Sequence, residues 1–252
     1  MSLKPTLIFA PGSWYPTSSF DPLTTLLESH GYTTHTIAFP SITQATAVKD
    51  LSNDIAAVRA LIEPEVEKGR DVVVIAHSWA GLPVNSALEG LIKTQSSGNE
   101  REEKGGGGVV KLLFISAFIP EIGQSLVSTF GGEAEWYVKD PTSKTITPST
   151  PHSLFFHDVP KGEYWASTLR PAAWATTIAP ATAAAYLSLP SSYLLCEEDR
   201  AIPLFVQQMM VDKARGNGAQ MGTVTVKTGH TPWLVETEWV GSWIRGEVGE
   251  EV

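Results

Sequence analysis

The chain has 252 residues, of which 42% are hydrophobic and 18% charged, a composition typical of one sizeable globular α/β domain or two small ones. With 27 acidic against 18 basic residues, the net charge is −9 and no basic cluster stands out, so we expect no nucleic-acid partner. The single cysteine, Cys196, excludes an internal disulfide and a cysteine-built metal site.

No apolar stretch approaches the roughly 20 residues that a membrane-spanning helix requires, and the N-terminus lacks a signal-like hydrophobic region. We therefore expect a cytoplasmic protein without a membrane partner. We expect it to act on a small molecule as a monomer or homodimer. Because no group of histidines and carboxylates has zinc-like spacing, we also expect no metal.

Short apolar strands alternate with amphipathic helices along most of the chain. The first half of the chain predicts strands at 6–10, 33–37 and 72–75, and helices that begin near 18 and at 48. Pro64 is expected to kink or end the second of these helices. A polar, glycine-rich surface loop without chemistry is predicted at 94–108. Later strands are expected at 109–118, 193–196 and 222–226, with helices at 203–214 and 236–245. This alternation predicts an α/β fold, a mostly parallel sheet with helices on both faces.

The segment between Pro120 and Pro190 interrupts this alternation, because it contains many aromatic residues and no clear strand–helix unit. An excursion of this length is too long for a plain connection. We predict that residues 120–189 form a cap over the active site, with helical spacing around 172–189. Residues 1–119 and 190–252 would form the core. An unrelated small domain is the alternative, although the segment has no obvious core of its own.

The stretch 71–81 is typical of a nucleophile elbow. A buried β-branched strand, Val72 to Ile75, ends in Ala-His-Ser-Trp-Ala-Gly and is followed by a helical pattern. Such a turn lifts the Ser78 hydroxyl above the sheet and directs the backbone N–H of Trp79 at an oxyanion beside it. The usual glycines of G-x-S-x-G are Ala76 and Ala80 here. By itself, the motif also fits a buried strand followed by a serine-started helix.

Two further loops at strand ends supply partners for this serine. Glu197, Glu198 and Asp199 follow one late strand, and His230 follows the last. Their order along the chain, serine, acid and then histidine, is that of α/β-hydrolases. The sequence register alone leaves Glu198 as the alternative to Asp199.

On these motifs the chain resembles the α/β-hydrolase superfamily over nearly its whole length. The closest likeness is to the compact, cofactor-free branch that contains plant methyl-ester esterases and hydroxynitrile lyases. The resemblance implies Ser78 as nucleophile, His230 as general base and acid, and Asp199 as its orienting partner, with no cofactor. The branch carries His-Gly-x in its first loop. Here that loop reads Pro11-Gly12-Ser13, which implies that the Ser13 N–H pairs with that of Trp79 in an oxyanion hole.

The remaining candidates are mostly aromatic and are expected around the substrate. They are Trp14, His77, Phe118, Trp136, Trp165, Trp174 and Trp233. Of these, His77 is expected to pack behind the nucleophile rather than to transfer protons. In the cap, His152 and His157 are expected to be loop residues, with substrate contact as the alternative.

The function expected first is a serine hydrolase that cleaves an ester, thioester or lactone bond in a small, fairly apolar substrate. The alternative is a lyase, C–C bond-cleaving enzyme or cyclase of small-molecule metabolism that uses the same serine and histidine as a proton shuttle. Hydroxynitrile lyases of the resembling branch carry threonine and lysine where this chain has Gly12 and Thr231, so cyanohydrin cleavage is not expected. A ligand receptor on the same scaffold is the least favoured interpretation.

Overall fold

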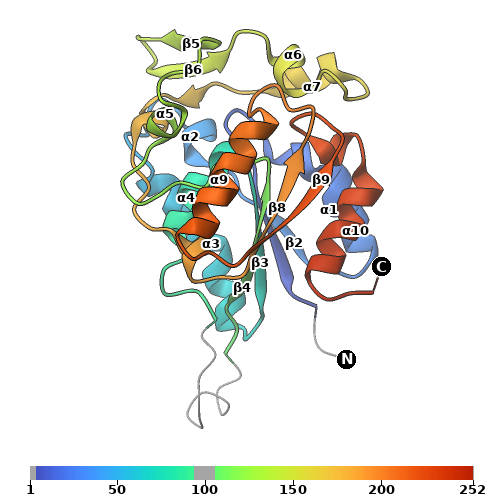
Figure 1. Ribbon diagram of the computed structural model, residues 1–252. Coiled ribbons are helices and arrows are strands. Elements are labelled where there is room, and N and C mark those ends of the chain that lie inside the picture. The colour runs from blue at the N-terminus through green and yellow to red at the C-terminus, as the bar shows by residue number, and fades with distance from the viewer. Residues whose placement is uncertain (1–3, 94–105, 252) are drawn as a thin grey trace.

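The computed structural model describes residues 4–93 and 106–251, and residues 94–105 of the predicted glycine-rich loop lie outside this part. Its centre is a six-stranded sheet in the spatial order β2-β1-β3-β4-β8-β9, in which every paired strand is parallel (Figure 1). The strands are β1 (Thr6–Ala10), β2 (Thr34–Thr36), β3 (Val72–His77), β4 (Val109–Ile115), β8 (Ser191–Cys196) and β9 (Met221–Val226). The predicted α/β fold with a mostly parallel sheet is confirmed.

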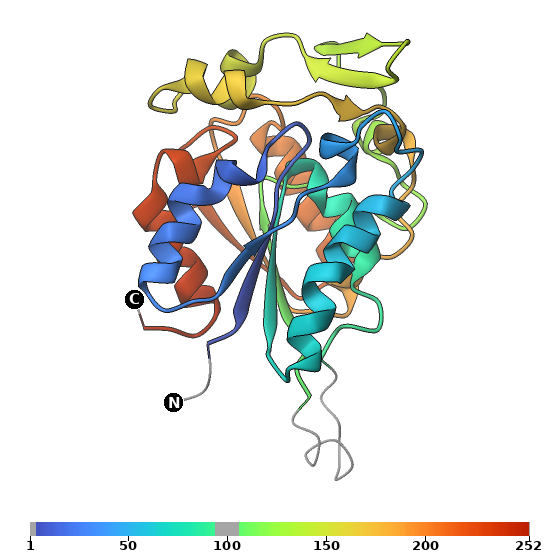
Figure 2. The ribbon, with the colours of Figure 1, turned by 180° about the vertical axis from the view of Figure 1, so that it is seen from behind.

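Helices cover both faces of this sheet, as Figures 1 and 2 show from opposite sides. One face packs on α3 (Ser52–Glu67), α4 (Gly81–Ala87) and α9 (Leu204–Gly216), and the other packs on α1 (Asp21–Ser29) and α10 (Thr237–Glu247). Successive side chains of a strand point to opposite faces, so Val72 and Val74 enter one core while Val73 and Ile75 enter the other. This double burial explains why the strands are continuously apolar.

Helix α3 continues through Pro64 to Glu67, so of the two expected effects of this proline, a kink or an end, the structure excludes the end. The turn after the proline is held by the buried carboxylate of Glu65. It accepts hydrogen bonds from the Thr6 hydroxyl at 2.8 Å, from Lys68 Nζ at 2.8 Å and from Arg70 Nη1 at 2.9 Å. These three bonds offset the backbone hydrogen bond that a proline removes from a helix interior.

Much of the segment 120–189, which was predicted as a cap and is called the cap below, lies over the carboxyl ends of the central strands (Figure 1). It contains a three-stranded antiparallel sheet, β5-β6-β7, that the sequence did not predict. Its elements are α5 (Leu126–Phe130), β5 (Tyr137–Asp140), β6 (Thr145–Pro148), α6 (Pro151–Phe155), α7 (Gly162–Thr168), β7 (Ala172–Ala173) and α8 (Ala175–Ile178). A short helix α2 (Pro40–Thr43) contacts β7 from the core side.

The helical spacing expected at 172–189 is replaced by β7, the one-turn helix α8 and a 3₁₀ turn at 185–187. The hydroxyls of Thr176 and Thr177 each donate to the backbone carbonyl three residues earlier, a local bond that competes with a longer helix. Ala179 precedes Pro180 and has an extended backbone, because a residue before proline avoids the helical region. The pattern of apolar residues alone did not reveal these breaks.

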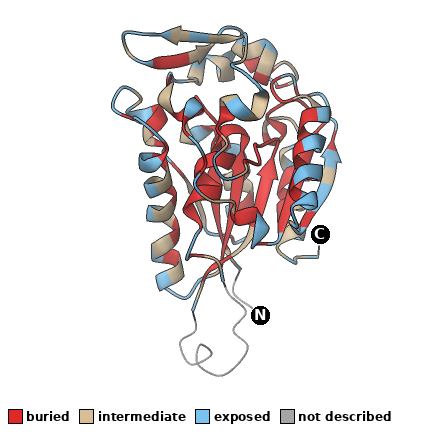
Figure 3. Cartoon of the chain, turned by 60° about the vertical axis from the view of Figure 1, so that its left-hand side comes forward, coloured by how far each residue is buried: buried red, intermediate tan, exposed pale blue. Residues whose placement is uncertain are grey.

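The apolar face of the cap packs on the first loop of the core. The buried side chains of Trp14 and Tyr15, which follow β1, form one cluster with Ile146, Phe155 and Phe156 of the cap. Figure 3 shows that the central strands of the sheet are buried, whereas the cap is a mixture of buried and exposed residues. The first loop therefore lies between the sheet and the cap.

No helix within the described ranges is both long enough and apolar enough to cross a membrane.

Candidate active site

The turn after β3 holds Ser78 in a strained conformation. Ser78 has φ of 54°, a left-handed value that is unfavourable for a residue with a side chain and is found preferentially at functional sites. A Cβ at Gly81 would lie 1.9 Å from the Phe118 carbonyl oxygen, so the backbone needs a glycine at this position. Ala80 has ordinary helical angles and tolerates its methyl group. The requirement for glycine has thus moved one residue along from the usual motif.

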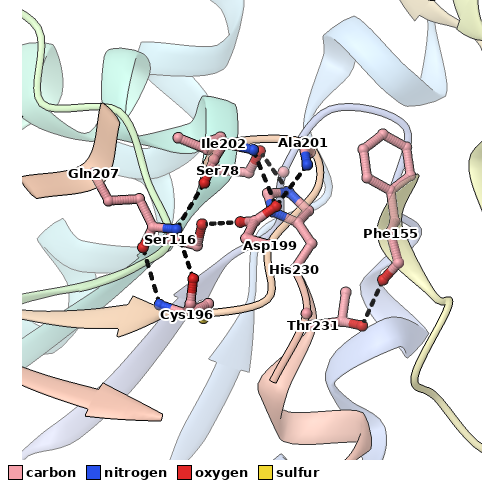
Figure 4. A network of polar contacts seen from close by, with 12 residues as sticks. Ser78, Ser116, Phe155, Cys196, Asp199, Ala201, Ile202, Gln207, His230 and Thr231 are labelled. Atoms are coloured by element: carbon pink, nitrogen blue, oxygen red, sulfur yellow. Dashed lines mark hydrogen bonds and ion pairs between the residues drawn. The ribbon is translucent and has the colours of Figure 1, made fainter. Parts of the chain in front are cut away.

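The side chains of Ser78, His230 and Asp199 form one hydrogen-bonded line above the sheet (Figure 4). His230 Nε2 lies 3.0 Å from Ser78 Oγ, and His230 Nδ1 lies 2.7 Å from Asp199 Oδ2. All three residues are buried. With the proton on Nδ1 directed at the carboxylate, Nε2 is free to accept the proton of the serine hydroxyl. This arrangement can generate a nucleophilic serine oxygen.

The Asp199 carboxylate accepts hydrogen bonds from other donors besides His230. Its Oδ1 accepts from the backbone N–H of Ala201 at 2.7 Å and of Ile202 at 3.0 Å, and its Oδ2 also accepts from the hydroxyl of Ser116. Ser116 directly follows β4 and was missed by the sequence analysis. The available signal was its place at a strand end, which it shares with the other three residues.

Glu198, the alternative acid, makes no hydrogen bond to His230 among the described residues. Its side chain is 46% exposed, and its Oε1 lies 4.0 Å from Lys227 Nζ. The structure therefore brings Asp199, and not Glu198, to the imidazole.

The two backbone N–H groups expected to form an oxyanion hole belong to residues that border the same cavity as Ser78. Ser13 and Trp79 both line it, and the Ser13 N–H has no acceptor within the described part of the chain. A Cβ at Gly12 would lie 2.8 Å from the Cβ of Ser78, so a glycine is what allows the first loop to approach the nucleophile this closely.

His77 connects the first loop to the loop of His230. Its Nδ1 accepts a hydrogen bond from the Gly12 N–H at 3.3 Å, which leaves the proton on Nε2, 3.1 Å from the His230 carbonyl oxygen. Burial, with a smaller contribution from nearby His230, holds the pKa of His77 well below its ordinary value. His77 is therefore neutral and joins two loops of the site, without lining the cavity.

The cavity beside Ser78 is narrow and aromatic. Its volume is about 20 Å³, room for about one water molecule. The lining residues, none of which carries a formal charge, are Ser13, Trp14, Ser78, Trp79, Phe118, Leu126, Phe130, Trp136, Tyr137, Phe155, Ala201 and Ile202. Three of the aromatic candidates, Trp14, Phe118 and Trp136, are among them. Ser13, Ser78 and Trp79 were predicted as well. The lining residues that sequence missed approach Ser78 only through the folding of the cap and of the loop after Asp199, and they are Leu126, Phe130, Tyr137, Phe155, Ala201 and Ile202.

Three tryptophans expected near the substrate do not line this cavity. Trp233 is fully buried, donates its indole N–H to the Ser19 carbonyl oxygen at 2.7 Å and stacks on Phe20. Trp174 lies beneath the ammonium group of Lys139. The third, Trp165, packs with the cap cluster. Sequence could not separate these roles, because a tryptophan in a core and one in a pocket look alike.

The two cap histidines also lie away from the cavity. His152 is half-exposed and its Nδ1 lies 3.6 Å from Glu163 Oε1, whereas His157 packs over Gly229. In the described ranges, no three His, Cys, Asp or Glu side chains are arranged to hold a metal ion.

A parallel α/β sheet that carries a serine, a histidine and an aspartate at its carboxyl edge defines the architecture of an α/β-hydrolase. The model of the Alpha/beta hydrolase family matches residues 7–240, and the chain belongs to this family. The resemblance noted in the sequence and the expectation of an enzyme are thereby confirmed.

Comparisons with individual proteins agree with this family. The chain is 29% identical to an alpha/beta hydrolase of Aspergillus novofumigatus, a match that covers 99% of both chains. Among solved structures, it resembles a pyrethroid hydrolase from Sphingobium faniae, with a TM-score of 0.76, 15% identity and 97% of both chains covered. It also resembles polyneuridine aldehyde esterase, with a TM-score of 0.75, 16% identity and coverage of 97% of this chain and 99% of the other. At these identities, the structural likenesses show the fold alone.

Proposed function

We propose that the protein is a serine hydrolase that cleaves an ester, thioester or lactone bond in a small, fairly apolar substrate. The observation that carries the proposal is the continuous line from Ser78 Oγ through His230 to Asp199, with donor–acceptor distances of 3.0 and 2.7 Å. Two of the structural relatives are named as a hydrolase and an esterase, which supports the same reaction class.

In this mechanism, Ser78 Oγ attacks the carbonyl carbon while His230 Nε2 takes the hydroxyl proton. Asp199 stabilises the imidazolium that forms. The negative charge that develops on the carbonyl oxygen is stabilised by the backbone N–H groups of Ser13 and Trp79. His230 then returns its proton to the leaving group, and water releases the acyl group from Ser78.

The proposed substrate class follows from the cavity walls. Aromatic and aliphatic side chains surround Ser78, and no charged side chain is among those that line the cavity. A charged group on the acyl part of a substrate would lose its hydration there without gaining a partner. We therefore propose uncharged, small-molecule esters or lactones as substrates.

Replacement of Ser78 by alanine tests this function. With a panel of uncharged aromatic and aliphatic esters and lactones, Ser78→Ala should lower kcat by roughly 10⁴-fold or more, because the nucleophile is removed. Ser167→Ala, a change at an exposed cap serine, is the matched control and should retain wild-type rates. If Ser78→Ala kept its turnover while His230→Ala lost it, the acyl-serine mechanism would be excluded in favour of the proton shuttle.

A further inference from the structure

The cap holds the loop of His230 on both sides of the histidine. On one side, the backbone N–H of Gly229 donates to Asp158 Oδ2 at 2.5 Å. On the other, the hydroxyl of Thr231 donates to the carbonyl oxygen of Phe155 at 3.0 Å (Figure 4). Both acceptors belong to the cap segment 155–158, which begins at the last residue of α6. Each residue next to His230 is therefore bonded to the cap.

The approach of Asp158 to this loop depends on a glycine. A Cβ at Gly229 would lie 2.6 Å from Asp158 Oδ1 and 2.7 Å from His157 Cε1, so a side chain at this position would push these two cap side chains away. The backbone of residue 229 is thus in direct contact with the cap.

The second oxygen of Asp158 shows that the carboxylate is placed at some cost. Oδ1 is buried and has no hydrogen-bond partner among the described residues. A buried carboxylate oxygen without a partner is unfavourable, and such groups in folded proteins call for an explanation. An asparagine would offer the same acceptor to Gly229 without a formal charge, which makes it a matched substitution.

We propose that the cap segment 155–158 is the positioning element of His230, with Asp158 as its principal residue. His230 must keep Nδ1 against Asp199 and Nε2 against Ser78 at the same time. One bond to the cap holds the Gly229 backbone and another holds the Thr231 side chain, on either side of His230. The bond from His77 Nε2 to the His230 carbonyl oxygen holds the residue itself. The cap would then position His230 in addition to covering the active site.

The kinetic part of this inference rests on the proposed function. A misplacement of about 1 Å in a catalytic group can lower a rate by about 10²-fold. Asp158→Ala should therefore lower kcat for ester hydrolysis by about tenfold or more, with a smaller change in KM. Asp158→Asn retains an acceptor for Gly229 and should restore kcat to within about threefold of wild type.

A spectroscopic measurement does not depend on turnover. The His230 Nδ1 proton, in a short hydrogen bond to Asp199, should give a far-downfield proton resonance, identified by its loss in His230→Gln. We expect Asp158→Ala to shift or broaden this resonance and Asp158→Asn to preserve it. Asp140→Ala, which removes a fully exposed carboxylate elsewhere in the cap, is the matched control and should change neither kcat nor the resonance.

Two results would overturn the inference: kcat and resonance unchanged in Asp158→Ala, or Asp158→Asn impaired as strongly as Asp158→Ala. If Asp158→Ala does not fold, as judged by its thermal unfolding, Thr231→Val removes the second bond and must show the same signature. An unchanged Thr231→Val would then contradict the proposal. A wild-type protein that hydrolyses no ester but shows the resonance would contradict the proposed function alone.

Discussion

At the scale of single residues, the position of Asp199 decides which acid serves the histidine. Asp199 is buried and bonded to His230 and two backbone N–H groups, whereas Glu198 is 46% exposed. Asp199→Asn should therefore lower kcat by about 10³-fold or more, because the amide favours the wrong imidazole tautomer. Glu198→Gln should stay within about threefold of wild type. Steady-state kinetics of the two variants checks this, and the reverse ranking would transfer the acid role to Glu198.

Ser116 supplies a smaller contribution at the same carboxylate. Its hydroxyl donates to the Asp199 oxygen that also bonds His230, in a fully buried environment. Because a hydrogen bond to a charged group contributes more than a neutral one, Ser116→Ala should lower kcat by about tenfold. Ser128→Ala, in the cap helix α5, offers a serine control away from the triad. Equal kcat values in wild type and Ser116→Ala would show that the other hydrogen-bond donors hold Asp199 in place without Ser116.

At the scale of elements, the contact between α2 and α3 contains a buried acid that should make stability depend on pH. Asp54 Oδ1 accepts from the Ser41 N–H at 3.0 Å, and burial raises the pKa of Asp54 to about 6. Since this folded-state pKa lies above the ordinary value of 3.8, the charged form opposes folding. Its contribution to the free energy of unfolding therefore rises as the pH falls through about 6 towards 4.

Asp54→Asn removes that charge and keeps an acceptor for Ser41. It should raise the free energy of unfolding by about 1–3 kcal/mol at about pH 8 and by less at about pH 5. The Ser41 hydroxyl is buried without a hydrogen-bond partner among the described residues and could accept from the new amide. Denaturant titrations at the two pH values measure the difference. An equal gain in the free energy of unfolding at both pH values would mean that the charge of Asp54 is not the source of the gain.

The elements that the sequence predicted have longer patterns of apolar residues than the elements that it missed. The strands at Val72 and Val109 and the helix at Ser52 have continuous apolar runs or repeated helical spacing, which local physics fixes. The cap strands β5, β6 and β7 have two to four residues each, too few for a period to show. β5 and β6 pair as a hairpin, whereas β7 joins β6 from much further along the chain, so the whole sheet also depends on a distant partner.

The site residues likewise divide into those that a local sequence pattern reveals and those that only the fold brings together. Ser78, Asp199 and His230 could be found because each lies in the turn or loop that follows a strand, and parallel strands bring their carboxyl ends to one edge. Phe155 and Asp158 could not, because they reach the site only through the fold of the cap. A histidine next to the nucleophile, His77, was recognised as a packing residue, but its bonds to two loops required coordinates.

At the scale of the whole molecule, side chains of the cap and of the core narrow the cavity beside Ser78 to about 20 Å³, so we expect its walls to limit the size of a substrate. Trp136 is the residue to change, because it is half-buried and contacts Trp14 and Phe155 at ring distances of 5.7 Å. Trp136→Ala should raise kcat/KM for bulky aryl esters relative to acetate esters by about tenfold. An unchanged ratio would show that Trp136 does not limit substrate size.

The central claim is that the three residues at the carboxyl edge make Ser78 a nucleophile. Mass spectrometry after exposure to a fluorophosphonate tests it most directly, because the reagent forms a covalent bond with an activated serine. We predict a single adduct that maps to Ser78, no adduct in folded Ser78→Ala and much slower labelling in His230→Ala. A folded wild-type protein that remains unmodified, or an adduct that persists in Ser78→Ala, would contradict the account.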